Sequence, residues 1–127
     1  MSIEQNKQRG RGTALKGEKM VMVYLSGKMT GLEQSVYERN FRKGEEFYKA
    51  CGFSVVNPCD LSVLVQREKE NPTYEDYMQK DLEALRRCTH IAMLEGWETS
   101  PGARREKAEA ERLGLEIMYL KFIGGRK

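Results

Sequence analysis

The chain alternates between short apolar runs and longer stretches with the spacing of an amphipathic helix. An uninterrupted apolar run that ends at turn residues is typical of a strand buried on both faces in a parallel sheet. Such turn residues follow the first two runs, at Ser26-Gly27 and at Asn57-Pro58. The pattern predicts four strands, over residues 21–25, 53–56, 90–94 and 115–120.

Helical spacing marks three of the stretches between these runs. Apolar residues recur every three or four positions in the first of them. Thr73 and Asp76 form a capping-box pattern ahead of the second, and Ser100 with Pro101 supplies an N-cap and a first-turn proline for the third. We therefore predict helices over residues 37–51, 73–85 and 100–113.

The segment 60–71 has no clear pattern. Leu61, Leu64 and Val65 allow one or two helical turns before charged residues take over. The same segment is equally compatible with a mobile flap. Its role is not read from the sequence.

Strands that alternate with helices form right-handed crossovers, so their sheet is parallel and is covered on both faces. We expect a three-layer α/β domain of the Rossmann or flavodoxin-like class with four to five strands. In such sheets ligands bind beyond the carboxyl ends of the strands, where the strand order reverses. If the order is 2-1-3-4, the loops 26–31 and 96–102 border that crevice.

The composition limits the class of protein. With 39% hydrophobic and 32% charged residues, the 127-residue chain has the composition of a globular protein. The longest apolar run, residues 20–25, is too short to span a bilayer, and residues 1–19 lack the apolar core of a secretory signal. We expect a cytoplasmic protein that makes no membrane contact, with one domain over residues 20–127.

The net charge of +3 comes from residues 1–19, which hold five Lys and Arg residues against two Glu residues. This segment is predicted to be a flexible basic tail. No basic helix or basic-aromatic surface follows it, so specific binding of nucleic acid is not expected.

The three cysteines, Cys51, Cys59 and Cys88, have no CxxC spacing, and His90 is the only histidine. A disulfide framework or a zinc site is therefore not expected. We predict buried or half-buried thiols, no metal and no cofactor.

Two acidic residues occupy positions where their helices should be apolar. Asp81 shares the apolar stripe of the second predicted helix, and Glu106 lies on the small-residue face of the third. A buried carboxylate without a partner is costly, so each has a partner or serves a function. The pattern also allows simpler interpretations, in which Asp81 pairs with Lys80, Arg86 or a backbone amide and Glu106 is solvated.

Three motifs within residues 21–119 carry a resemblance to a known family. They are Tyr24-Leu25-Ser26-Gly27-Lys28-Met29-Thr30-Gly31, Asp81-Leu82, and Ser100-Pro101-Gly102-Ala103 followed by Glu106. In order and spacing they resemble the nucleoside 2-deoxyribosyltransferase-like superfamily, and the chain looks closest to its small, phage-associated, uncharacterised branch. It is also similar to the 2'-deoxynucleoside 5'-phosphate N-hydrolases.

The resemblance implies that Glu106 is the nucleophile that attacks the anomeric carbon of the sugar and forms a glycosyl-enzyme ester. It implies that Asp81 binds the leaving base and helps to protonate it. A carboxylate suits the first role because the transition state resembles an oxocarbenium ion. The N-terminus of a helix also favours the ionised form of Glu106.

The same resemblance suggests a set of substrate contacts. They are Tyr24, Ser26, Gly27, Lys28, Met29, Thr30, Gly31, Trp97, Ser100 and Gly102. Ser100 stands in the region where deoxyribosyltransferases carry an aspartate, and a hydroxyl beside free helix amides suits a 5'-phosphate, with Lys28 as its counter-charge. Lys28 replaces a proline of the branch, and Thr30 replaces an arginine of the hydrolases. Tyr24 and Trp97 either flank the base or sugar or close the edge of the core.

We therefore expect an N-glycosidase that hydrolyses 2'-deoxynucleoside 5'-monophosphates to a free base and deoxyribose 5-phosphate. The nearest alternative is a nucleoside 2-deoxyribosyltransferase, which exchanges bases. A different class is a non-catalytic nucleotide-binding or sensing domain. The resemblance also implies a homodimer or higher homo-oligomer, for which the sequence offers the aromatic residues Tyr74, Tyr77 and Phe122 as contacts.

Overall fold

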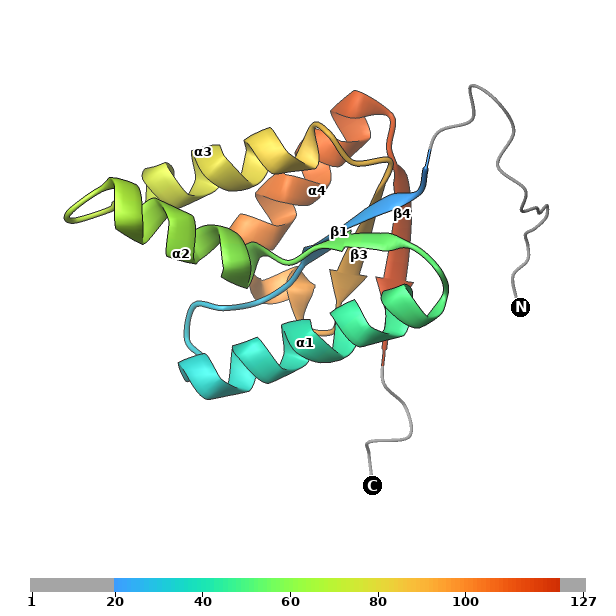
Figure 1. Ribbon diagram of the computed structural model, residues 1–127, viewed down its shortest axis with the longest axis horizontal. Coiled ribbons are helices and arrows are strands. Elements are labelled where there is room, and N and C mark those ends of the chain that lie inside the picture. Colours follow the sequence, from blue (N-terminus) through green and yellow to red (C-terminus); the bar gives the residue numbers. More distant parts are fainter. Residues whose placement is uncertain (1–19, 122–127) are drawn as a thin grey trace.

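The computed structural model describes residues 20–121. The tail predicted over residues 1–19 and the contact predicted at Phe122 lie outside these residues. Four strands, four α-helices and one short 3₁₀ helix follow one another along the chain (Figure 1). They are β1 (Met22–Ser26), α1 (Gln34–Ala50), β2 (Ser54–Val56), α2 (Pro58–Glu68), α3 (Tyr74–Leu85), β3 (His90–Leu94), η1 (Trp97–Thr99), α4 (Pro101–Leu113) and β4 (Glu116–Leu120).

The four strands form one parallel sheet in the order β2-β1-β3-β4. The central register pairs Tyr24 of β1 with Ile91 of β3, and Ile91 with Ile117 of β4. All four predicted strands are present, and the order is the one under which the loops 26–31 and 96–102 border the crevice. The domain therefore has an α/β fold of the Rossmann or flavodoxin-like class, with its strand order reversing at β1.

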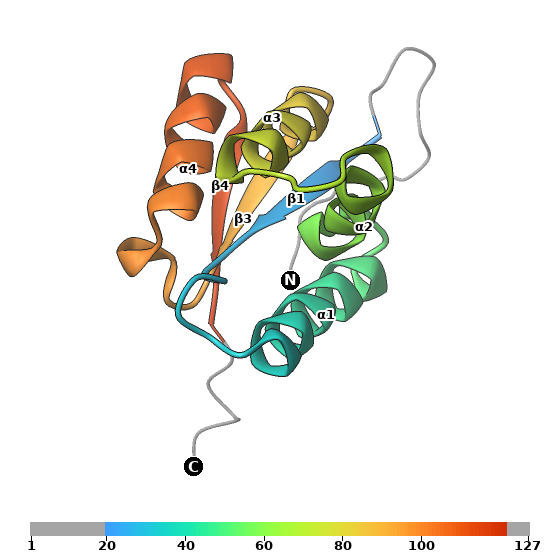
Figure 2. The ribbon, with the colours of Figure 1, turned by 90° about the vertical axis from the view of Figure 1, so that its left-hand side faces the viewer.

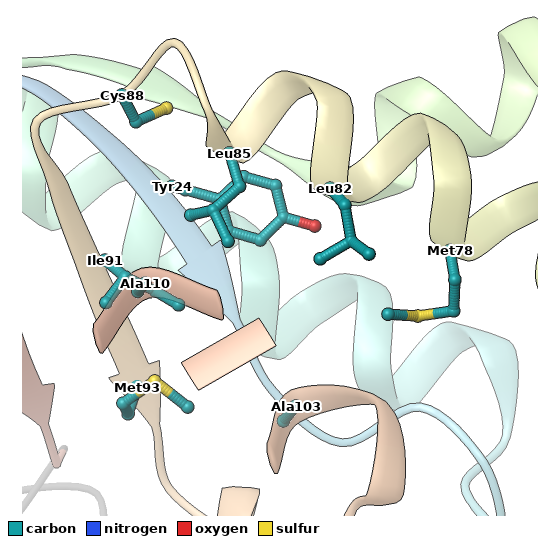
Figure 3. Packing of buried hydrophobic residues seen from close by; sticks show 9 residues of the cluster. All are labelled: Tyr24, Met78, Leu82, Leu85, Cys88, Ile91, Met93, Ala103 and Ala110. Carbon is teal, nitrogen blue, oxygen red and sulfur yellow. The ribbon is translucent and has the colours of Figure 1, made fainter. Parts of the chain in front are cut away.

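Helices cover both faces of the sheet (Figure 2). On one face, α1 packs through Phe41 and Tyr48 against Val23 and Leu25 of β1. On the other face, α3 and α4 pack against the opposite side chains of the same strands. This second cluster (Figure 3) contains Tyr24, Met78, Leu82, Leu85, Cys88, Ile91, Met93, Ala103 and Ala110. The alternation of side chains along β1 thus contributes to both halves of the core.

The residues predicted to cap the second and third helices do so at the starts of α3 and α4. Thr73 and Asp76 form the capping box of α3, with the Asp76 amide donating to Thr73 Oγ1 at 3.1 Å and the Thr73 amide donating to Asp76 Oδ2 at 2.9 Å. Ser100 caps α4, and Gly114 ends it. None of the helices within residues 20–121 is long and apolar enough to cross a membrane.

Helix α2 is longer than the pattern indicated. It runs from Pro58 to Glu68, so the expectation of one or two turns or a flap over residues 60–71 is wrong. Its start was misassigned because Asn57 and Pro58 were interpreted only as the end of a strand. Asn57 Oδ1 accepts the Cys59 amide at 2.9 Å, and Pro58 stands in the first turn. Leu61 and Val65 then face the core.

The three thiols are free and differ in exposure. Cys88 is buried and Cys59 is half-buried, as predicted. Cys51 is exposed, because it follows α1 at the C-cap and turns away from the sheet, so the prediction for this residue is wrong.

Candidate active site

A cleft of about 380 Å³ opens at the carboxyl end of β1, between α1 and α2 on one side and α3 and α4 on the other. Its lining includes Gly27 and Thr30 from the loop after β1, Ser100 from the loop after β3, and both candidate carboxylates, Asp81 and Glu106. The strand order reverses at this point of the sheet, where α/β domains bind their ligands.

Glu106 is held inside the protein at the floor of this cleft. It lies on the small-residue face of α4, between the buried Ala103 and Ala110, and is 5% exposed. Tyr24 Oη donates a hydrogen bond to its Oε2 at 2.8 Å, and Ser26 Oγ donates to its Oε1 at 2.6 Å. The alternative that Glu106 is a solvated surface residue is therefore wrong.

Asp81 faces Glu106 from α3 and shares a hydrogen bond with it. The simpler partners proposed for Asp81 are engaged elsewhere, because Lys80 pairs with Glu68 and Arg86 pairs with Glu109. The sequence pattern thus identified both members of a carboxyl pair that no local spacing links.

Burial sets the protonation of this pair. Removal from water raises the pKa of Asp81, and the charge of Glu106 raises it further. Burial also raises the pKa of Glu106, but the hydrogen bonds from Ser26, Tyr24 and Asp81 oppose that rise. Both groups therefore hold a proton to higher pH than ordinary carboxyl groups do, and when the pair holds a single proton, the hydrogen bonds to Glu106 favour Asp81 as its site and Glu106 as the anion.

Tyr24 supports Glu106 rather than the substrate. Its ring is fully buried beside Leu82 and Leu85 (Figure 3), and its hydroxyl donates to the carboxylate. Burial and the nearby Glu106 charge raise the Tyr24 pKa well above its ordinary value, so the hydroxyl keeps its proton. Tyr24 was predicted to flank the base or sugar or to close the core edge, and the structure places it in the core. Ser26, also fully buried, has a similar supporting position.

The loop after β1 approaches the cleft closely. Gly27 has no room for a side chain, since a Cβ would lie 3.1 Å from Leu94 Cβ and 3.3 Å from Phe41 Cζ. Met29 and Thr30 line the cleft. Gly31 turns the loop at a φ of +89°, which favours glycine.

Lys28 points to a different place. It borders a smaller hollow of about 210 Å³, together with Glu95 and Gly96, and this hollow shares Gly27 and Phe41 with the main cleft. Within the described residues, the lining of the main cleft contains three carboxylates, Glu38, Asp81 and Glu106, and no Lys, Arg or His side chain. The cleft is therefore acidic.

Ser100 and Gly102 stand at the start of α4, inside the cleft lining. Ser100 Oγ already accepts the Ala103 amide at 3.1 Å, and the Arg104 amide donates to Ser100 O at 2.9 Å. Pro101 has no amide proton. Of the helix amides expected to be free around Ser100, only the Gly102 amide is left to bind a ligand. The Ser100 hydroxyl can still donate a hydrogen bond.

A protein family model matches residues 21–119, and its description is "Domain of unknown function (DUF4406)". The chain belongs to this family. A comparison with curated proteins found no match. The DUF4406 match extends from β1 into β4, so it includes the whole cleft described above.

The aromatic residues of the DUF4406 cleft differ from those expected. Trp97 is absent from the cleft lining; its ring lies 5.9 Å from that of Tyr119, with Lys107 Nζ 5.5 Å from its centre. The aromatic residues in the lining are Tyr37, Phe41, Tyr74 and Tyr77. Tyr37 and Phe41 begin the apolar stripe of α1, so the sequence pattern predicts both in the core. The four-residue spacing shows one helix face but cannot separate its buried part from the part that borders a cleft.

Metal binding finds no support in this part of the DUF4406 chain. Among residues 20–121, no group of three or more His, Cys, Asp or Glu side chains is arranged to hold an ion. Cys59 borders the cleft, but burial, together with the charges of Glu38 and Asp60, raises its pKa to about 12. This thiol therefore stays protonated at neutral pH.

Proposed function

We propose that the protein is an N-glycosidase that hydrolyses the base–deoxyribose bond of 2'-deoxynucleoside 5'-monophosphates. The buried pair of Asp81 and Glu106 at one cleft carries this proposal. A carboxylate held by two hydroxyl donors beside a protonated carboxyl is the arrangement that glycosidic cleavage uses as nucleophile and acid. The motif resemblance to the nucleoside 2-deoxyribosyltransferase-like superfamily supports the same chemistry.

In the first step, a Glu106 oxygen attacks the anomeric carbon, and the bond to the base nitrogen breaks with its electron pair on that nitrogen. Asp81 gives its proton to the leaving base. The substrate must therefore enter between the two carboxyl groups and replace their mutual hydrogen bond. Tyr24 and Ser26 hold Glu106 in place during the attack.

In the second step, water hydrolyses the glycosyl ester. The water oxygen attacks the anomeric carbon while the Asp81 carboxylate takes a proton from this water, and Glu106 leaves as a carboxylate. The products are a free base and deoxyribose 5-phosphate. The pair then has one proton again and is ready for the next substrate.

Three groups have the chemistry to bind the 5'-phosphate. The Ser100 hydroxyl and the Gly102 amide are donors in the cleft, and Lys28 is a cation in the neighbouring hollow. Gly27 lies between the two spaces and lines both. A phosphate directed past Gly27 would therefore meet donors from both loops.

The acidity of the cleft favours a second candidate, a nucleoside 2-deoxyribosyltransferase. An uncharged nucleoside needs no cation, whereas a phosphate dianion would be repelled by Glu38 and by the single negative charge of the Asp81–Glu106 pair. In this case a second base, instead of water, resolves the ester.

Chromatography of free base tests both candidates. The four deoxynucleoside monophosphates and the four unphosphorylated nucleosides are incubated separately, each with and without an added base. We expect release from the monophosphates alone; exchange confined to nucleosides with an added base would establish the transferase instead. The matched controls are Glu106→Gln and Glu46→Gln, which make the same change in charge inside the cleft and on the exposed face of α1. Binding without release or exchange in the unaltered protein would contradict both candidates and favour a nucleotide-sensing domain.

A further inference from the structure

Glu38 is a cleft carboxylate that the proposed reaction does not use. It lies in the first half of α1, half-buried, on the face that also gives Tyr37 and Phe41 to the cleft. Its Oε2 accepts a hydrogen bond from Gln34 Nε2 at 2.7 Å. Within the described residues no ion pair holds this carboxylate, in contrast to Glu45 on the same helix.

A carboxylate in such a position can only accept hydrogen bonds. Its Oε1 takes part in no hydrogen bond within the described residues. A ligand with N–H or O–H groups at this height of the cleft would satisfy it, and a ligand with carbonyl oxygens there would be repelled. Glu38 is therefore suited to choose among ligands.

The location of Glu38 indicates which part of a nucleoside it would meet. Glu106 must face the sugar, and Asp81 must face the base that leaves. Glu38 of α1 and Asp81 of α3 line the same cleft, so the two carboxyl groups border one space from different helices. Tyr37, next to Glu38, and Tyr77, one turn before Asp81, also line it, and their rings give flat apolar surfaces that suit a base.

We propose that Glu38 makes the cleft selective for bases that carry an exocyclic amino group. This rests on the proposed function in taking the ligand to be a nucleoside or nucleotide. Guanine offers an amino group next to a ring N–H and should bind best, whereas thymine offers one N–H between two carbonyl groups and should bind worst. Adenine and cytosine, each with one amino group, fall between them.

Binding is measured in a protein that cannot turn the ligand over. The four deoxynucleosides and their monophosphates are titrated by calorimetry into the Glu106→Gln variant, with and without the further change Glu38→Gln. We expect the preference for deoxyguanosine over thymidine to fall by about 10- to 100-fold, since a hydrogen bond to a charged group is lost. The control Glu106→Gln/Glu46→Gln has the same charge and should keep the preference.

Three results would overturn the proposal. The first is an equal loss of affinity for all four bases, which would assign Glu38 to a sugar hydroxyl. The second is an unchanged preference, and the third is that none of the eight ligands binds. If Glu106→Gln does not fold, Glu38→Gln is compared with the unaltered protein by kcat/KM for each base. If the unaltered protein binds with a preference that depends on Glu38 but releases no base, the proposed reaction is disproved and this inference stands.

Discussion

Two buried glutamates of this protein, Glu45 on α1 and Glu106 on α4, have opposite surroundings. Glu45 is 9% exposed and bonds to two cations, with Arg42 Nη1 at 2.9 Å and Lys49 Nζ at 2.8 Å, while Asn57 Nδ2 donates at 3.1 Å. The bond from Lys49 is the main cause of its lowered pKa. Glu106 has hydroxyl donors and a second carboxyl group, and burial raises its pKa.

This difference separates a carboxylate neutralised by cations from one held by hydroxyl donors. The cations of Glu45 neutralise it, and Asn57 ties it to the start of α2, so it fixes one wall of the cleft. The donors of Glu106 orient its charge without neutralising it, which leaves the carboxylate able to form a bond with carbon. The burial of a glutamate therefore does not indicate its role unless its hydrogen-bond and ion-pair partners are known.

The largest effect is expected at Glu106. Glu106→Gln should lower base release by roughly 10³-fold or more, because the amide cannot form the ester. The free energy of unfolding should stay within about 1 kcal/mol, since one of the two hydroxyls of Tyr24 and Ser26 can keep donating to the amide oxygen while the other turns to accept from the amide nitrogen. Chromatography and urea unfolding measure the two quantities. Release at the unaltered rate would disprove the nucleophile.

Asp81→Asn should lower base release by about 10²–10⁴-fold, because the leaving base loses its proton donor. In the unaltered protein, release should fall as pH rises through the raised pKa of the pair, since Asp81 then loses its proton. The residual activity of the variant should lack this fall. A pH–rate series for both proteins measures it, and an identical alkaline fall in the variant would assign that titration to another group.

Glu45→Ala tests the other member of the comparison. It should lower the free energy of unfolding by about 1–3 kcal/mol, because the buried Asn57 amide loses its acceptor. Base release per folded molecule should stay the same. Urea unfolding is compared with Glu46→Ala, an exposed position on the same helix. Equal stability of the two variants would show that Glu45 does not hold α2.

The smallest effect concerns stability as a function of pH. Glu45, with a lowered pKa, contributes stability above the ordinary carboxyl pKa and loses it as pH falls through its folded value. The pair of Asp81 and Glu106, with raised pKa values, contributes below the ordinary pKa and loses this as pH rises through its folded values.

Thermal unfolding across pH should therefore show a flatter alkaline side in Glu106→Gln. The acid side should flatten only in part in Glu45→Ala, because Glu75 and Glu109 also have lowered pKa values beside Arg105 and Arg112. Curves that keep the shape of the unaltered protein in both variants would contradict these assignments.

The fold was predictable because its signals are local. Each strand contains a short apolar run, and the starts of α3 and α4 carry their own caps. The alternation of strands and helices predicted a parallel sheet, but the strand order was only assumed. Helix α2 was missed although Asn57-Pro58 is itself a helix-start signal, because the same residues also end a strand.

The site was predictable only in part. Asp81 and Glu106 were found because each interrupts an apolar face. Glu45 was missed although the same rule applies to it, because it lies four residues after Phe41 and three before Tyr48, on the buried face of α1. For Glu38, the spacing within α1 does not report that the neighbouring helices form a cleft above this end of the helix. For Trp97 the sequence left the cleft and the core edge open, and the structure places it against the core, because the course of η1 and β4 decides what covers its ring.

The hydrogen bonds of Glu106 reach back across 82 residues to Tyr24 and 80 residues to Ser26. They join the first strand to the last helix, and contacts of such long sequence separation form late, after the intervening chain has been ordered. During refolding, the helical signal should therefore recover before base release does. A chain still emerging from the ribosome would have its sheet begun and Glu106 not yet in place.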